Sequence, residues 1–269
     1  HLGALGEALH TGLAHGLVVG GDEAAEAHVL DALAQLGGEL GAGALSLFEQ
    51  FVVGEACGAF EQQYGTMLEN YVGSGDITLR VYPINFLDGQ SLGTKYSTRA
   101  ANLFACVVDQ QPDAAFALHT RLLSAEVQPA EGTTGLDDKQ LVQEAVAAGA
   151  EATTELQNCV RNRSIAGIIN ENNTWAMSDL VGLAEGEQLV ETTDNQGNPL
   201  TFQDADSPQR LVSTPLVIVN GKQWNGARDG SLESYILKVK GEIEQTNPGS
   251  SADEDAESDA DSATKEESE

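Results

Sequence analysis

The hydrophobic pattern of this chain changes its period twice, and this change restricts the folds open to it more than any other feature of the sequence. Residues 46–83 carry the pattern of a strand, a helix and a second strand. Residues 94–190 repeat their apolar positions at helical spacing, and strand patterns return after residue 210. This order predicts an α/β fold in which a helical block separates two sheet-forming halves.

The first half is predicted to be a strand–helix–strand unit. A short buried strand ends near residue 53, and residues 57–72 follow it as a helix. The helix has one apolar face, formed by Phe60, Tyr64, Met67, Leu68 and Tyr71. Residues 76–83 alternate apolar and polar side chains, as a strand does. Because the return from the helix is short, the two strands are expected to run parallel.

The rest of the chain supplies helices and then a hairpin. Four helices are predicted in the helical block, over residues 97–109, 113–123, 137–148 and 152–172. Asp137 and Gln140 have the spacing of a capping box at the start of the third helix. Residues 185–210 are polar and predict a loop. The last elements are a strand, an Asn-Gly turn, a partner strand and a closing helix, over residues 216–219, 220–221, 222–224 and 229–244.

The charge of the chain excludes one class of partner. It has 42 acidic and 13 basic residues and a formal net charge of −29 at pH 7. Nucleic acid is therefore not an expected partner, since phosphate binding needs clustered Lys and Arg. No run of 18 apolar residues is present, so no transmembrane helix is predicted. Residues 246–269 are predicted to be a disordered acidic tail, because they offer no large apolar side chain to bury.

Residues 1–45 form an extension of atypical composition. Residues 1–50 contain no Lys, Arg, Pro, Asn or Ile, and four of the five histidines lie there. His10 and His15 are five residues apart and do not share a helix face, so no metal site is predicted. Residues 22–40 fit a helix. Two interpretations stay open: a loosely ordered extension, and a fused, misassembled or frame-shifted start that is not native.

Two local sequences carry the features that point to chemistry. Ala56-Cys57-Gly58-Ala59-Phe60-Glu61 stands at the first strand-to-helix turn, and Val212-Ser213-Thr214-Pro215 precedes a predicted strand. Both resemble the DsbA-like family of thiol–disulfide oxidoreductases, in particular its actinobacterial members, in which Cys-Pro-x-Cys opens a helix and Gly-x-Phe follows. The resemblance covers residues 56–126 and 205–243. It implies a thioredoxin-like fold, with the helical block as an insertion, in a domain of residues 46–245.

The chemistry of the family explains both motifs. A thiolate, and not a thiol, attacks a disulfide, and a helix N-terminus stabilises that anion. The resemblance implies a cis peptide bond before Pro215, which faces the cysteines and lets a substrate peptide lie beside the sulfur. Thr214 and Pro215 are therefore expected to bind substrate. The implied activity is thiol–disulfide exchange with cysteines of exported proteins, without a cofactor.

This sequence departs from the family motif at the first cysteine. Cys57 matches the second, resolving cysteine, whereas Gly54 stands at the position of the first and Glu55 at the position of the proline. The usual dithiol cycle cannot run without the first sulfur, although a mixed disulfide through Cys57 remains available. Three interpretations stay open: a damaged or misassembled start, a redox-silent relative that binds peptides or partners, and an enzyme with Cys57 as its single thiol. A further alternative gives Cys57 no functional role and takes it as an inert buried thiol.

The other two cysteines and the family context complete the predictions. The resemblance implies a structural disulfide between Cys106 and Cys159, and two unrelated buried thiols are the alternative. It also implies an extracytoplasmic location and a membrane redox partner. The chain starts at His1, and a targeting segment is not present in this sequence. No metal is expected.

Overall fold

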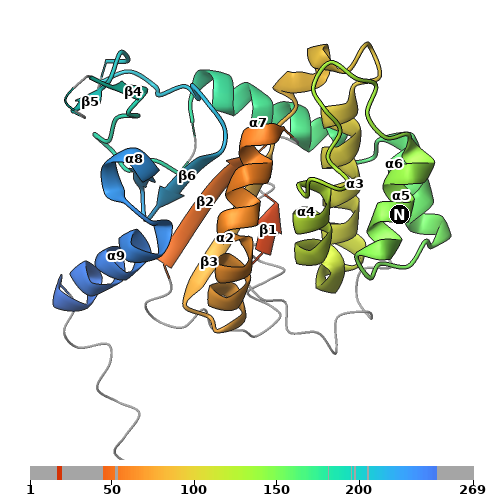
Figure 1. Ribbon diagram of the computed structural model, residues 1–269, viewed down its shortest axis with the longest axis horizontal. Helices are drawn as coiled ribbons and strands as arrows, with labels where there is room; N and C mark the ends of the chain where they lie inside the picture. Colours follow the sequence, from red (N-terminus) through yellow and green to blue (C-terminus); the bar gives the residue numbers. More distant parts are fainter. Residues whose placement is uncertain are drawn as a thin grey trace, which may run out of the picture.

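The computed structural model describes residues 17–19, 45–51, 54–180, 182–194, 196, 198–204 and 206–246. The helix predicted over residues 22–40 and the acidic tail predicted over residues 246–269 lie, but for Thr246, outside these residues. Figure 1 shows a central sheet with helix α2 (Glu55–Gly73) across it and the helical block beside it. No helix within the described ranges is long and apolar enough to cross a membrane.

Five strands form the central sheet in the described part of the chain. Their order across the sheet is β1 (Leu17–Val19), β3 (Ile77–Pro83), β2 (Leu45–Phe51), β6 (Leu216–Val219) and β7 (Lys222–Trp224). β3 runs parallel to β1 and β2, and β6 runs antiparallel to β2 and β7. The predicted parallel pair and the predicted hairpin are confirmed. β1 is not among the predicted elements, since three residues are too few to show a period.

Helix α2 begins at Glu55, two residues before the predicted start, and ends at Gly73. The chain then turns into β3 through Gly75, whose φ of 77° favours glycine. The helix contacts β3 on one side and α4 (Ala115–Leu122) on the other. Its buried apolar residues are Cys57, Phe60, Leu68 and Val72. The first turn of α2 is therefore held between the sheet and the helical block.

Helix α3 (Tyr96–Gln110) is the centre of the helical block. It contacts α4 and three later helices, α5 (Asp138–Ala147), α6 (Thr154–Asn162) and α7 (Ala166–Ser178). The short 3-10 helices η1 (Phe86–Gln90) and η2 (Pro112–Ala114) precede α3 and α4. The predicted capping box of α5 is confirmed, because Asp137 Oδ1 accepts from the Gln140 N–H at 2.8 Å and Gln140 Oε1 accepts from the Asp137 N–H at 2.9 Å.

The single helix predicted over residues 152–172 is wrong. α6 ends where Arg163 takes a left-handed conformation with φ of 55°. The Arg163 guanidinium donates to the Asp138 carboxylate of α5 at 2.9 Å. Asn102 Oδ1 of α3 accepts from the Ile165 N–H at 3.0 Å. Contacts with two other helices thus accompany the end of α6. The residue pattern of the segment itself gives no sign of these contacts.

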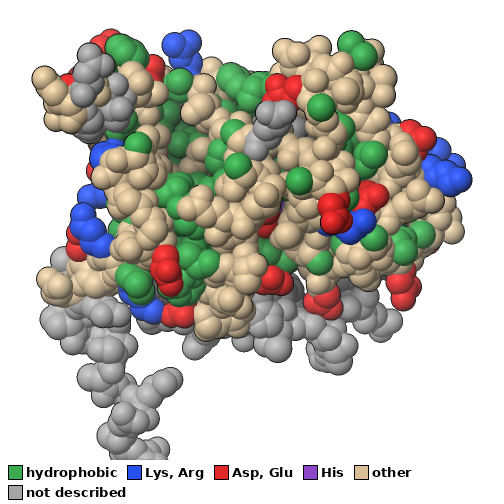
Figure 2. Space-filling model, viewed as in Figure 1, with side chains coloured by type: hydrophobic (Ala, Val, Ile, Leu, Met, Phe, Trp, Pro, Cys, Tyr) green, Lys and Arg blue, Asp and Glu red, His purple; other side chains and the backbone are tan. Residues whose placement is uncertain are grey.

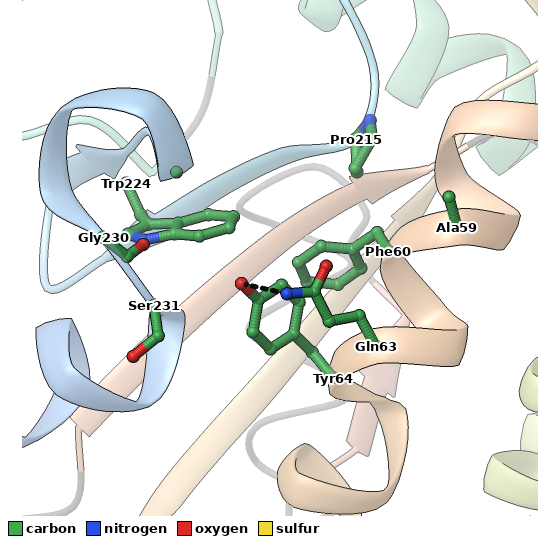
Figure 3. Close-up of a pocket in the computed structure, with 9 residues that line it drawn as sticks. Ala59, Phe60, Gln63, Tyr64, Pro215, Trp224, Gly230 and Ser231 are labelled. Carbon is green, nitrogen blue, oxygen red and sulfur yellow. Dashed lines mark hydrogen bonds between the residues drawn. The ribbon is translucent and has the colours of Figure 1, made fainter.

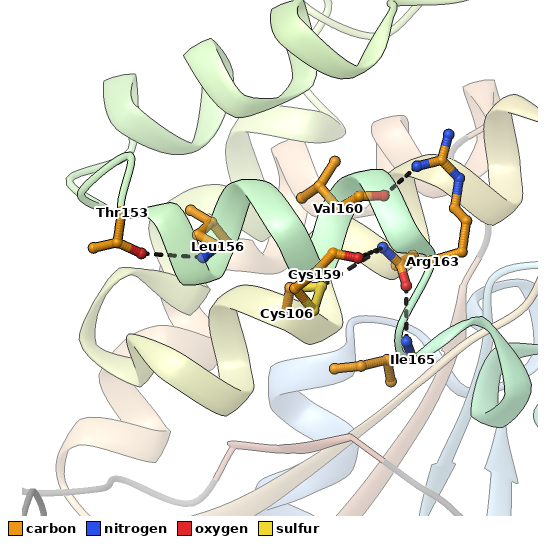
Figure 4. Close-up of a disulfide and its surroundings, with 8 residues drawn as sticks. Cys106, Thr153, Leu156, Cys159, Val160, Arg163 and Ile165 are labelled. Carbon is orange, nitrogen blue, oxygen red and sulfur yellow. Dashed lines mark hydrogen bonds between the residues drawn. A yellow bond between two sulfur atoms is a disulfide. The ribbon is translucent and has the colours of Figure 1, made fainter.

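A disulfide joins Cys106 of α3 to Cys159 of α6, as the family resemblance implies (Figure 4). The two Cα atoms are 6.1 Å apart and the cysteines are separated by 53 residues in sequence. Asn102 lies beside the bond and donates from Nδ2 to the Cys159 carbonyl at 3.3 Å. The disulfide therefore ties the central helix of the block to a helix that follows it much later in the chain.

The loop predicted over residues 185–210 contains a small hairpin of β4 (Thr192–Thr193) and β5 (Pro199–Leu200). Its turn is shaped by Asp194, whose Oδ1 accepts from two backbone N–H groups, each at 2.8 Å. Two-residue strands are too short to predict from alternation.

The closing helical segment is divided in two. α8 (Gly226–Asp229) precedes α9 (Leu232–Thr246), and Gly230 between them has φ of 76°. The predicted start of the last helix at residue 229 is therefore three residues too early. The turn predicted at Asn220-Gly221 is confirmed, with positive φ at both residues.

Gly58 allows the first turn of α2 to approach the end of α4. A Cβ atom at this position would lie 2.8 Å from the carbonyl oxygen of Leu123 and 2.3 Å from Oε1 of Gln128. Such a contact with backbone cannot be relieved by a side-chain rotation. The glycine that follows Cys57 in the motif is thus explained by close packing.

We expect reduction of the Cys106–Cys159 disulfide to lower the free energy of unfolding by about 4 kcal/mol, because a cross-link over a loop of this length restricts the unfolded chain. Urea unfolding with and without reductant measures the difference. The Cys106→Ser/Cys159→Ser variant should match the reduced chain and should not respond to reductant. A variant as stable as the oxidised chain would contradict the structural role of the bond.

We expect Gly58→Ala to lower the free energy of unfolding by roughly 1–3 kcal/mol, although alanine is the better helix former by about 1 kcal/mol. Gly73→Ala, at the other end of α2, is the matched control, because a Cβ there meets nothing within 4 Å. Urea unfolding of both variants should show a loss for the first and no loss for the second. Equal effects would show that helix propensity, and not packing against Leu123, decides the outcome.

Candidate functional site

Cys57 lies in the first turn of α2, the position that the motif predicts. Gly54 is the N-cap of the helix, and its carbonyl accepts the first helical hydrogen bond, from the Gly58 N–H at 3.0 Å. A thiolate in this turn is stabilised by the helix dipole. The Cys57 side chain is only 1% exposed and belongs to the main hydrophobic core. The structure therefore provides a favourable electrostatic position and a strong restriction on access.

The register between β2 and β6 brings Pro215 to this helix. Gln50 at the end of β2 pairs with Leu216 at the start of β6. Pro215, which precedes Leu216, therefore stands beside the connection from β2 into α2. The Thr214–Pro215 peptide bond is cis. The two predicted motifs, far apart in the sequence, meet at one edge of the sheet.

An open groove of about 550 Å³ lies between Pro215 and α2 (Figure 3). Residues of α2, of β7 and of the segment that leads into α9 line it together with Pro215: Ala59, Phe60, Gln63, Tyr64, Trp224, Gly226, Gly230 and Ser231. Cys57 and Thr214 are not among the lining residues. The groove thus begins next to the buried thiol and does not include it.

Three aromatic rings give the groove its character. The ring centroid of Tyr64 lies 5.2 Å from that of Phe60 and 5.4 Å from that of Trp224, the latter pair edge to face. Trp224 is held by its Nε1–H, which donates to the Gly230 carbonyl at 3.2 Å. Figure 3 shows the three rings turned toward one another below Pro215. Phe60 and Tyr64 are four residues apart on the predicted helix face, so the sequence predicts that they lie together. Nothing in the sequence around Trp224, in the hairpin, predicts that it joins them.

A buried Glu–His pair joins the helix that carries the thiol to α4. Glu61 Oε2 is 3.3 Å from His119 Nε2 of α4, and both side chains are almost fully buried. Glu61 Oε1 accepts from Thr120 Oγ1 at 2.7 Å. Burial raises the pKa of the Glu61 carboxyl, but the charge of His119 and the hydrogen bonds from His119 and Thr120 lower it more, so the pKa lies below its ordinary value of 4.5. Sequence reasoning placed Glu61 in the motif without a role, and His119 lies too far away in the chain to suggest one.

Among the described residues there is no group of three or more His, Cys, Asp or Glu side chains that would hold an ion. His10 and His15 lie outside them.

We expect the wild-type chain to lose stability as the pH falls below 4.5. A carboxyl whose pKa is lowered by folding stabilises the native state above its unfolded pKa, and this contribution disappears as the pH falls through the folded pKa. Glu61→Gln should cost about 3 kcal/mol at pH 7, because it breaks a buried pair, and the cost should shrink between pH 5 and pH 3. Urea unfolding across this range measures it. Glu69→Gln, on the exposed side of α2, should differ little from wild type at any pH, and a Glu61→Gln cost that is the same at pH 7 and pH 3 would contradict the ion pair.

Known proteins share this architecture. Residues 55–183 match the thioredoxin family model. The serine/threonine-protein kinase PknE of Mycobacterium tuberculosis is 30% identical over 137 residues, which are 50% of this chain and 24% of the kinase. The same protein of Mycobacterium bovis matches equally. The chain thus spans about a quarter of the length of these curated relatives, and the described residues contain the thioredoxin-like part.

Solved structures extend the likeness beyond the region of the family match. The reduced form of a disulfide bond oxidoreductase, DsbG, from M. tuberculosis is 21% identical with a TM-score of 0.53, and the match covers 74% of this chain and 77% of that chain. DsbA of M. tuberculosis in its oxidised form gives the same identity and TM-score, covering 74% and 82%. The thiol-disulfide oxidoreductase MdbA of Actinomyces oris is 14% identical with a TM-score of 0.52, covering 75% and 81%. The family match and these solved structures together show that this chain has a thioredoxin-like fold.

Proposed function

We propose that this chain binds extended segments of cysteine-containing exported proteins in the groove beside Pro215 and exchanges disulfides with them through Cys57. The observation that carries the proposal is the groove itself. Pro215 and the aromatic side chains of α2 and β7 form an apolar cleft one turn of helix away from the thiol. Apolar clefts with a few polar groups are the usual binding sites of proteins. Three of the solved structures that share the fold carry the name of a disulfide oxidoreductase or of DsbA.

The exchange balances without an added oxidant. The Cys57 thiolate attacks one sulfur of a partner disulfide, the partner S–S bond breaks, and the other partner cysteine leaves as a thiolate. A partner thiolate then attacks the partner sulfur of the mixed disulfide, which forms a new partner disulfide and returns the Cys57 thiolate. Because Gly54 supplies no second sulfur, the chain itself is neither oxidised nor reduced over the cycle. The proposed outcome is rearrangement of disulfides, which does not require the membrane redox partner that the family resemblance implies.

Access to Cys57 requires the first turn of α2 to open. The N-cap, Gly54, has no side chain that could cap the helix, so opening this turn breaks no side-chain cap. The disulfide of α3 and α6 supports an extracytoplasmic place of action, because such bonds persist in oxidising compartments.

The burial of Cys57 favours one second candidate, a redox-silent protein that binds peptides or partners. A thiol with 1% exposure in a packed core is inert in most proteins, and the groove does not include it. In this alternative the groove binds the same extended segments and no covalent step follows.

We expect the wild-type chain to accelerate the rearrangement of scrambled ribonuclease disulfides in a thiol buffer, and Cys57→Ser to abolish this activity. Binding of a fluorescent peptide should remain unchanged in Cys57→Ser, because the thiol does not line the groove. Trp224→Ala should weaken that peptide at least ten-fold, as loss of a central aromatic does at interfaces. Leu237→Ser, an exposed position on α9 outside the groove, is the control.

The outcomes separate the two candidates. Rearrangement that depends on Cys57 supports exchange. Peptide binding that depends on Trp224, with no rearrangement by wild type, overturns exchange and supports the redox-silent binder. A chain that neither rearranges disulfides nor binds peptides through Trp224 overturns both.

A further inference from the structure

A second apolar surface lies away from the groove, on the segment between α7 and β6. Eight large hydrophobic side chains are exposed among the described residues, and four of them belong to this region or to the end of α7: Met177, Leu200, Phe202 and Val212. Phe202 is 70% exposed and Val212 is 52% exposed. Single exposed hydrophobic residues need no explanation, but a group of them marks a binding surface. We call these four residues the 202–212 surface, after Phe202 and Val212, the two most exposed of them.

Hydrogen bonds join the segments that carry Phe202, Val212 and Met177. The Gln203 side chain donates to the Arg210 carbonyl at 2.9 Å and accepts from the Arg210 N–H at 2.6 Å. Phe202 and Val212 therefore flank a cross-linked stretch. The Leu211 N–H donates to the Ala176 carbonyl at 2.6 Å, which brings Val212 beside Met177. Figure 2 shows hydrophobic side chains close to acidic ones over the β4–β5 region, and the face is hollowed next to it.

The 202–212 surface is linked to the groove by a short stretch of chain. Val212 is followed by two residues and then by Pro215, so at most about 10 Å of chain separates the two, and the chain bends at residues 213–215. The main-chain groups of Ser213 and Thr214 make no hydrogen bond within the part of the chain that the structure describes. A peptide that hydrogen-bonds to these main-chain groups would pass from the groove to Val212.

Charge restricts what such a peptide contains. Residues 179–210 include seven acidic residues and a single basic one, Arg210. Asp204 and Asp206 are exposed and lie in the chain between Phe202 and Val212. Glu185, earlier in the same segment, is exposed as well. Lys or Arg in the bound segment would gain from this field, and an acidic segment would be repelled. The same charge disfavours an anionic membrane and, at a net charge of −29, a second copy of the chain.

We propose that the 202–212 surface binds the part of an extended partner polypeptide that carries a large apolar side chain next to Lys or Arg, three to five residues from the cysteine. This inference rests on the proposed function, since it extends the same groove. In this arrangement the groove binds the residues next to the partner cysteine. The 202–212 surface binds the sequence that flanks them. The preferred partners are thus unfolded segments with a basic and apolar stretch near a cysteine.

The test uses the full chain and fluorescent twelve-residue peptides in which serine replaces the cysteine. One pair of peptides carries Phe with two Lys four residues before or after the serine. In matched peptides Gly replaces Phe, or Glu replaces both Lys. Fluorescence anisotropy gives each Kd at low and high salt.

Phe202→Ser/Val212→Ser should weaken the better Phe–Lys peptide at least ten-fold and should leave the Gly peptide within two-fold of wild type. Leu92→Ser and Leu237→Ser are the controls, because their side chains are 70% and 54% exposed, as much as those they match, but lie elsewhere in the chain. The Glu peptide should bind at least ten-fold more weakly than the Lys peptide, and salt should reduce the difference. Thermal unfolding of each variant checks that the fold is intact.

Three results would overturn the inference. They are a double variant within two-fold of wild type, equal loss in the controls, and equal binding of the Lys and Glu peptides. Trp224→Ala separates this failure from that of the proposed function. If Trp224→Ala weakens the peptide and the double variant does not, the 202–212 surface is dispensable and the groove stands. If no variant has an effect, or no peptide binds, the groove fails as well.

Discussion

The pairing of β2 with two different strands determines where everything else in the molecule lies. β2 is parallel to β3 on one side and antiparallel to β6 on the other. The parallel pair requires α2 to cross the sheet between the two strands, and it places the N-terminus of α2 at the end of β2. The antiparallel pair places the start of β6 at that same edge. Backbone pairing of the strands therefore brings the segment of Pro215 to the same edge of the sheet as the N-terminus of α2, where Cys57 lies.

The helical block acts on this edge by holding the first turns of α2. Gly58 admits the end of α4 against the helix, and one turn later Glu61 is paired with His119. A buried ion pair adds little net stability compared with apolar packing, but breaking it is costly, so it disfavours any other alignment of the two helices. The disulfide then links α3 to α6 within the helical block. Access to the thiol is thus governed by how easily the first turn separates from α4.

Local signals in the sequence were sufficient for some elements and uninformative for others. The capping box at Asp137, the Asn220-Gly221 turn and the strands on either side of α2 follow from neighbouring residues, and the structure confirms them. The break after α6 depends on Asp138 and Asn102, which lie on other helices, so helical spacing alone runs through it. At the candidate site, the motif residues were predictable because they stand in one short stretch each. Trp224, which completes the groove, comes from a strand whose place only the whole sheet defines.

The absence of a sulfur at position 54 affects the two halves of the site unequally. The groove is made by Pro215, by side chains one turn or more into α2, and by the β7–α9 region. None of these depends on residue 54, which contributes only its backbone as the N-cap. The groove residues of α2 and the position of the missing sulfur lie in different turns of the helix, so the lining of the groove does not change when that sulfur is absent. The proposed selectivity for partner segments therefore does not depend on the missing sulfur. The chemistry of the chain is then limited by the single sulfur that the helix still presents, and by the packing that covers it.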